Sequence, residues 1–216
     1  LCPLVCPVDA IRTQRTINGH WYISTTEWGP MAHARLGIAE ENSGRLVTEV
    51  RNAARNMADD YGASLILGDG PPGTGCPVIA SVSGSDMVVV VTEPTVSGVH
   101  DLERVLKLAT HFGVRAAVII NKADLNDEQA AAIESAAHVY DARIIGRIPF
   151  DREINSALMS GKTIIDHGKG IAVDAVRTTW ERLVSLLEGG RTSPDSSIEQ
   201  GVYYENCSYS HRQNTR

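Results

Sequence analysis

Four short apolar runs, rich in β-branched residues, recur along the chain and set the strongest limit on its fold. They cover residues 64–67, 87–92, 116–120 and 143–148. Strands that are apolar on both faces are typical of a parallel sheet covered by helices. Apolar residues at helical spacing lie between and around these runs, at about 46–61, 100–112, 127–139 and 170–187. This alternation predicts an α/β fold with a doubly wound, mostly parallel sheet.

The two flanks of this region differ from it in composition. Between residues 18 and 36, the runs HWYIST and PMAHARL are separated by Glu27, Trp28 and Gly29, which predicts a β-hairpin or a pair of edge strands. After Glu188 the sequence is polar and offers too little apolar surface to offset the entropy cost of ordering it. We therefore expect residues 189–216 to form a disordered tail.

Charge, hydropathy and cysteine spacing exclude several classes of protein. The 216 residues carry a formal net charge of -6 and no basic cluster, which argues against binding to nucleic acid. No apolar stretch approaches the roughly 20 residues that cross a bilayer, so no membrane segment is expected. The cysteines, at positions 2, 6, 76 and 207, are too dispersed for the disulfide framework of a small secreted protein. These features together predict a cytoplasmic protein.

The run ASLILGDGPPGTG, residues 63–75, places an aspartate at the end of an expected strand and a Gly/Pro loop after it. Its glycines fit the dinucleotide pattern G-x-G-x-x-G, but Pro71 and Pro72 remove N–H donors and Asp69 adds a negative charge. A carboxylate here suits hydrated Mg²⁺ that bridges to a phosphate, as a Walker B acid does, with Gly73 in a loop that senses the γ-phosphate. A plain strand-to-helix turn capped by Asp69 is the alternative.

A phosphate-binding Walker A loop, G-x-x-x-x-G-K-[ST], is missing from the sequence. The nearest segment, SALMSGKT at residues 156–163, has serine where the first glycine belongs. We expect this segment to be the end of a short helix capped by Asp151, with Gly161 at the left-handed position after it. Because the chain also begins with Leu1, we expect a fragment that lacks its N-terminal part.

Two further polar loops follow expected strands. Asn121, Lys122 and Asp124 form an N-K-x-D sequence, whose amide and carboxylate groups complement the donors and acceptors of a purine. Pro149, in the run IPFD, could pack against the same base, and the run TEPT at residues 92–95 closes a third strand. Loops at the carboxyl ends of parallel strands line one crevice, so we expect these loops to share a nucleotide site. For the N-K-x-D sequence, the alternative is an ordinary polar turn. For the run IPFD, the alternative is a helix cap.

The chain begins with Cys2 and Cys6 in the spacing C-x3-C-P, the last part of a bacterial ferredoxin motif. This predicts ligands of a 4Fe-4S cluster, although two thiols cannot complete one, and a structural or zinc-binding pair is the alternative. Cys76 is expected to be a small, half-buried thiol. The remaining candidates show no metal spacing and no paired nucleophile: His33, His100 and His111.

In order along the chain, the C-x3-C-P end, GPMAHARLGIAEENSGRLV, DGPPGTGCPVIAS, VVTEPTVSGVHDLERVL, NKADLN and IPFD resemble one family. It comprises the MinD-like P-loop ATPases that carry an inserted ferredoxin domain and are related to the Mrp iron–sulfur carriers. The resemblance covers about residues 2–187. It implies three regions: the end of a 4Fe-4S insert at 1–19, a nucleotide-binding domain at 20–188, and the tail.

The resemblance also implies roles for single residues. Asp69 corresponds to the Mg²⁺-linked Walker B acid, Gly73 to part of the switch II loop, and Asn121 and Asp124 to adenine contacts. Cys2 and Cys6 correspond to cluster ligands. The implied cofactors are ATP, Mg²⁺ and one or more 4Fe-4S clusters, and the implied partners are a second copy in a homodimer and an iron–sulfur client or redox protein. Without a Walker A lysine, the chain alone is not expected to hydrolyse ATP at a useful rate.

Two alternatives from other classes stay open. One is a non-enzymatic ferredoxin-type carrier whose nucleotide-binding domain only regulates it or docks it to a partner. The other is a synthase that amidates a corrinoid acid, which would need a glutamine-handling domain that the sequence does not show.

Overall fold

A computed structural model describes residues 6–8, 10, 17, 19–38, 40 and 43–189 of the protein. The described residues divide into two compact units, one that ends at Asp69 and one that begins at Gly70. Cys2 and the expected tail from residue 190 onward lie outside the described residues. The expected boundary at residues 19 and 20 stays a prediction.

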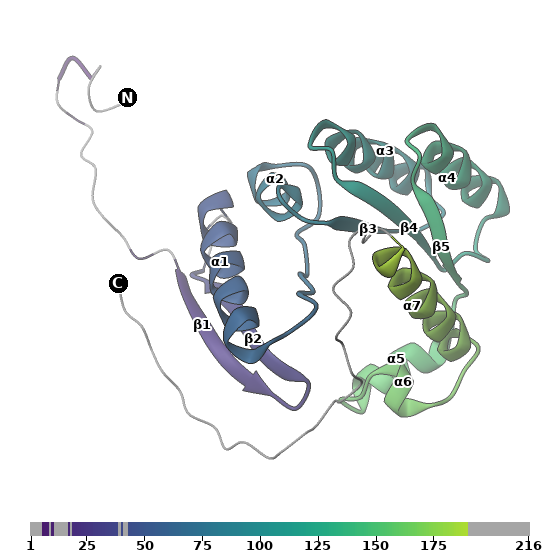
Figure 1. Cartoon of the computed structure of the whole chain (residues 1–216). Helices are drawn as coiled ribbons and strands as arrows, with labels where there is room; N and C mark the ends of the chain where they lie inside the picture. Colours follow the sequence, from purple (N-terminus) through teal and green to yellow (C-terminus); the bar gives the residue numbers. More distant parts are fainter. Residues whose placement is uncertain are drawn as a thin grey trace. The chain divides into compact units, whose positions relative to one another are not determined.

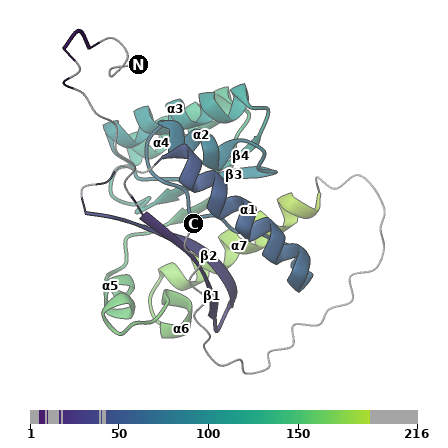
Figure 2. The same cartoon turned by 90° about the vertical axis from the view of Figure 1, so that its left-hand side faces the viewer.

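The first unit contains a hairpin and a helix. Strands β1 (Gly19–Thr26) and β2 (Gly29–Leu36) pair in antiparallel register, with Tyr22 opposite His33, so the hairpin prediction is confirmed. The rings of Tyr22 and His33 stack at 5.4 Å, and His33 Nε2 lies 2.9 Å from Ser24 Oγ. Helix α1 (Gly44–Tyr61) starts at Ser43, whose side chain accepts the Leu46 N–H, and packs on β2 (Figures 1 and 2).

The second unit is a parallel three-stranded sheet covered by helices. Strands β3 (Met87–Thr92), β4 (Arg115–Asn121) and β5 (Arg143–Ile148) lie in the order β3-β4-β5. Helices α3 (Val96–His111) and α4 (Asp127–Val139) pack together on one face, and α7 (Ala172–Glu188) packs on β5 from the other (Figure 1). The predicted α/β class with a parallel sheet is confirmed.

Three shorter helices complete the second unit: α2 (Cys76–Val82), α5 (Arg152–Met159) and α6 (Ile164–His167). The core lies between the sheet and helices α3 and α4, because the apolar stripes of both helices meet strands that are apolar on this face. Its largest fully buried side chains are Leu102, Leu106, Val118, Ile120 and Ile133. No described helix is long and apolar enough to cross a membrane.

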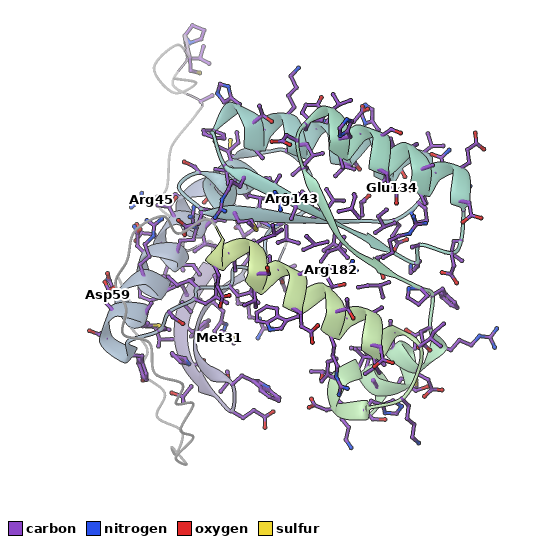
Figure 3. All side chains as sticks on the ribbon, turned by 45° about the vertical axis from the view of Figure 1, so that its right-hand side comes forward. Met31, Arg45, Asp59, Glu134, Arg143 and Arg182 are labelled. Carbon is purple, nitrogen blue, oxygen red and sulfur yellow. The ribbon has the colours of Figure 1, made fainter. Side chains whose placement is uncertain are left out.

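Two arginine contacts fasten β5 to its neighbours. Arg147 on β5 forms an ion pair of 2.6 Å with Glu134 on α4. A register shift leaves Ile145 without a partner residue on β4, and the Ile145 carbonyl accepts a hydrogen bond of 3.3 Å from Arg182 on α7. Figure 3 shows Glu134 and Arg182 on these two helices. Arg182 therefore satisfies a carbonyl that the bulge takes out of the strand ladder.

The strand expected at residues 64–67 is not formed, so this prediction is wrong. The segment is irregular, and Leu65, Ile66 and Leu67 are 45%, 49% and 77% exposed. A strand needs a neighbour that pairs with its N–H and C=O groups, and none of the described strands pairs with this segment. The apolar pattern identifies a segment suited to a sheet, but pairing requires a partner.

The expected end of a helix at residues 156–163 is confirmed. Asp151 caps α5 by accepting the Glu153 N–H, and Gly161 has φ 66. Cys76 is exposed at the first position of α2, so the expected half-burial is wrong. His111 is the last residue of α3, and His100 lies inside this helix, which begins after the N-cap Thr95.

Candidate functional site

The candidate site of the second unit is built from three loops that follow β3, β4 and β5. In a parallel sheet these loops lie at the same edge, outside the carboxyl ends of the strands, which is where such sheets bind ligands. The predicted residue Asn121 ends β4, Lys122 and Asp124 lie in the loop after it, and Pro149 lies in the loop after β5. The structure therefore brings this group of predicted residues to one edge of the sheet.

The loop after β4 is tied by two hydrogen bonds to the last residue of β5 and to the loop that follows it. Ala123 N–H donates to the Ile148 carbonyl at 2.9 Å, and Asp124 Oδ1 accepts the Phe150 N–H at 2.6 Å. A short bond to a charged acceptor is among the stronger hydrogen bonds in proteins. Asp124 thus holds the backbone around Pro149 in place, a role that the sequence pattern does not reveal.

The loop after β4 is also tied to the loop after β3. Lys122 Nζ lies 2.7 Å from Glu93 Oε1, and both side chains are partly exposed. Lys122 has φ 53, a left-handed conformation that is uncommon for residues with a side chain and that concentrates at functional sites. Its ammonium group is compensated by Glu93, so Lys122 acts here as a link between loops.

The loop after β3 is made rigid by close backbone packing. Thr92 Oγ1 donates to the Gly98 carbonyl at 3.0 Å, and Gly98 N–H donates to Thr95 Oγ1 at 2.9 Å. A Cβ atom at Gly98 would collide with the Glu93 carbonyl oxygen. Only glycine therefore lets the first turn of α3 approach the loop so closely, which fixes the backbone that carries Glu93.

Asp151 connects the edge of the sheet to α7. Its Oδ1 accepts the Glu153 N–H and its Oδ2 accepts the Ala172 N–H, both at 2.9 Å. These backbone N–H groups, with Ala172 the larger effect, hold the pKa of the Asp151 carboxyl below its ordinary value of 3.8. The carboxylate form is the one that the folded protein prefers.

We predict a pH-dependent contribution of Asp151 to stability. Because its pKa is depressed in the folded state, the contribution is fully present well above pH 3.8 and is lost as the pH falls through the folded-state pKa. Asp151→Ala should lower the free energy of unfolding in urea, and this deficit should shrink when the comparison is repeated at successively lower pH. A deficit that stays the same down to about pH 2 would contradict the assignment.

The residues predicted from the start of the chain and from the Gly/Pro loop do not belong to the three loops that follow β3, β4 and β5. Asp69 is exposed and is the last residue of the first unit, while Gly73 has φ 89 and belongs to the second. Cys6 Sγ accepts the Ala10 N–H at 3.3 Å. Among the described residues, no group of three or more His, Cys, Asp or Glu side chains could hold a metal ion.

A cavity of about 440 Å³ opens between β5 and α7, away from the loops described above. It is lined by Arg147, Asp174, Arg182 and neighbouring residues of both elements. None of the predicted site residues lines it, and both of its arginines already have partners, Glu134 and the Ile145 carbonyl. The edge loops are the better candidate for a ligand site than this cavity, because their polar groups are held in a fixed arrangement.

Comparison with solved structures identifies the fold. The MinD cell division protein of Aquifex aeolicus is 27% identical and superposes with a TM-score of 0.54, covering 68% of this chain and 62% of that one. The chain has the fold of the MinD-type ATPases. MinD of Pyrococcus horikoshii, solved with Mg-ADP, has a TM-score of 0.55 at 20% identity over 70% of this chain and 60% of its own. The MinC:MinD complex of Aquifex aeolicus gives 0.55 at 22% identity, over 84% and 70%.

Sequence comparison adds two uncharacterized proteins of Methanocaldococcus jannaschii. MJ0578 is 28% identical over 158 residues, which cover 73% of this chain and 52% of that protein. MJ0579 is 23% identical over 153 residues, covering 69% and 49%. The chain thus spans about half the length of the curated relatives it matches. No protein-family model matches it.

Proposed function

We propose that this chain supplies the base-binding side of an ATP site in a magnesium-dependent ATPase of the MinD type. The observation that carries the proposal is the linked set of loops at the carboxyl edge of the sheet, where Asp124 holds the Phe150 N–H. Asn121, the last residue of β4, is partly buried at this edge. Its amide can both donate to and accept from an adenine ring.

The residues at this edge fit a purine base. Pro149 is partly buried and Phe150 is 42% exposed, so together they offer an apolar surface for one face of the ring. Asn121 supplies the polar group that fixes its orientation. This combination of an apolar wall and a few placed polar groups is typical of sites for small organic ligands.

The proposal assigns Asp69 to magnesium and Gly73 to a loop that responds to the terminal phosphate. Bound Mg²⁺ would neutralise charge on the phosphates. Asp69 fits this role because its carboxylate is exposed and hard oxygen ligands suit Mg²⁺. Gly73 fits a moving loop because φ 89 is readily adopted only by glycine.

The iron–sulfur part of the proposal rests on sequence alone. Cys6 and Cys2 have the spacing of ferredoxin ligands, but two thiols do not complete a 4Fe-4S cluster. We extend the proposal to a homodimer whose nucleotide state controls cluster assembly, cluster transfer or electron transfer with a client protein. Iron and acid-labile sulfide in the purified natural-length protein, lost in Cys6→Ser, would support it. Their absence from the wild-type protein purified without oxygen would contradict it.

The nucleotide site is tested by binding a fluorescent ATP analogue to the natural-length protein with Mg²⁺ present. Asn121→Ala should weaken binding about tenfold, the effect of roughly one well-placed hydrogen bond. The affinity for inorganic tripolyphosphate should not change, because it has no base. Asn52→Ala, at an exposed position of α1, is the matched control. Equal ATP affinities of the wild type and Asn121→Ala would contradict the assignment of the base.

Measuring ATP hydrolysis distinguishes an ATPase from a non-enzymatic carrier that has the same domain. The ATPase predicts release of phosphate that requires Mg²⁺, whereas the carrier predicts nucleotide binding and cluster retention without hydrolysis.

A further inference from the structure

The loop at residues 70–75 contacts helix α3 through one long side chain. Arg104 Nη2 donates to Thr74 Oγ1 at 2.9 Å, across a separation of 30 residues in the sequence. Thr74 lies between Gly73, which has φ 89, and Gly75, so both neighbours in the chain are conformationally free. The hydrogen bond from Arg104 therefore fixes the position of a loop that its own sequence leaves mobile.

Arg104 has a second partner within reach. Its Nη1 lies 3.7 Å from Asp101 Oδ1, one turn earlier on α3, and the Arg104 side chain is 52% exposed. An ion pair of this length between exposed groups is weak. The guanidinium can therefore leave Thr74 and move closer to Asp101, so it keeps one partner when the contact with Thr74 breaks.

We propose that Arg104 is a positioning residue that holds the loop 70–75 in its resting state. This inference rests on the proposed function, in which the loop moves when a nucleoside triphosphate binds. In the resting state the guanidinium binds Thr74. When the loop moves, this hydrogen bond breaks and the guanidinium pairs with Asp101.

This role predicts an increase in affinity when the contact is removed. A group that stabilises only the resting state lowers the apparent affinity of any ligand that requires the other state. Arg104→Ala should therefore bind the non-hydrolysable analogue AMP-PNP about threefold to tenfold more tightly, the range expected for one hydrogen bond. ADP, which lacks the terminal phosphate, should bind with unchanged affinity. Loss of a merely structural contact would instead weaken the binding of both ligands or leave both unchanged.

The test measures Mg²⁺-dependent binding of AMP-PNP and of ADP to the natural-length protein. Thr74→Val removes the acceptor from the other side and should give the same selective gain, and the double variant should gain no more than either single one. Arg177→Ala, an exposed arginine on α7, should change neither affinity. Hydrogen exchange of residues 73–78 without nucleotide should be faster in Arg104→Ala and Thr74→Val.

The possible outcomes separate this inference from the proposed function. If the wild-type protein binds both nucleotides and Arg104→Ala binds AMP-PNP no more tightly, the positioning role is wrong and the proposed function stands. If the wild-type protein binds neither nucleotide, both are wrong. A selective gain for AMP-PNP in both single variants, without additivity, supports the role of Arg104.

Discussion

Leu106→Ala is expected to lower the free energy of unfolding by about 3–5 kcal/mol, far more than a typical surface truncation. Leu106 is 0% exposed on α3 and packs in one cluster with Leu102, Val118, Ile120 and Ile133. Removing its side chain loses buried apolar area and leaves a cavity that the surrounding side chains fill only in part. Urea unfolding followed by circular dichroism measures the change.

The matched control is Leu158→Ala on α5, where the leucine is 67% exposed. The same truncation at this position should change stability by less than about 0.5 kcal/mol. If Leu106→Ala costs less than about 1 kcal/mol, the assigned core between α3, α4 and the sheet would be wrong.

Asp69→Ala is expected to reduce Mg²⁺-dependent ATP hydrolysis by the natural-length protein about 100-fold or more, the scale of losing one aligned electrostatic contact in an active site. The physical reason is that the carboxylate would hold the ion that neutralises the phosphates. The rate of phosphate release is measured with and without Mg²⁺. Activity without Mg²⁺ should be equally low in the wild type and the variant.

The control for this variant is Asp60→Ala, which removes an exposed carboxylate from α1 of the same unit. It should leave the rate unchanged. Hydrolysis by Asp69→Ala at the wild-type rate would contradict the proposed role of Asp69 in binding magnesium, and it would leave the proposal for the adenine base untouched.

The strands and the longer helices of the second unit could be predicted because each depends on a local pattern, whereas the short helices α2 and α6 were not predicted. The apolar run MVVVVT predicts the strand at Met87–Thr92. The apolar stripe that contains Leu102 and Leu106 predicts the helix that packs on the sheet. Residues 64–67 carry an equally apolar pattern and do not form a strand, because pairing depends on a neighbour that the pattern does not specify. Local periodicity thus predicts which segments suit a sheet, and pairing decides which of them become strands.

The residue types at the edge of the sheet were also predictable, but not their contacts. Asn121, Lys122 and Asp124 are recognisable from N-K-x-D, whereas the pairing of Lys122 with Glu93 and of Asp124 with Phe150 depends on how neighbouring loops are placed. The hydrogen bond from Arg104 to Thr74 joins residues that share no motif. These contacts join residues that are far apart in the sequence, so the spacing of residues in a motif does not predict them.

The proposed nucleotide site at the carboxyl edge is tested most directly by hydrogen exchange of the natural-length protein with and without Mg-ATP. We expect slower exchange on binding in residues 121–125 and 148–151, where Asn121, Asp124 and Pro149 lie. Protection in both segments, reduced in Asn121→Ala, would place the nucleotide at the carboxyl edge of the sheet. Protection confined to β5 and α7, where the 440 Å³ cavity lies, or no protection at saturating Mg-ATP, would contradict this placement.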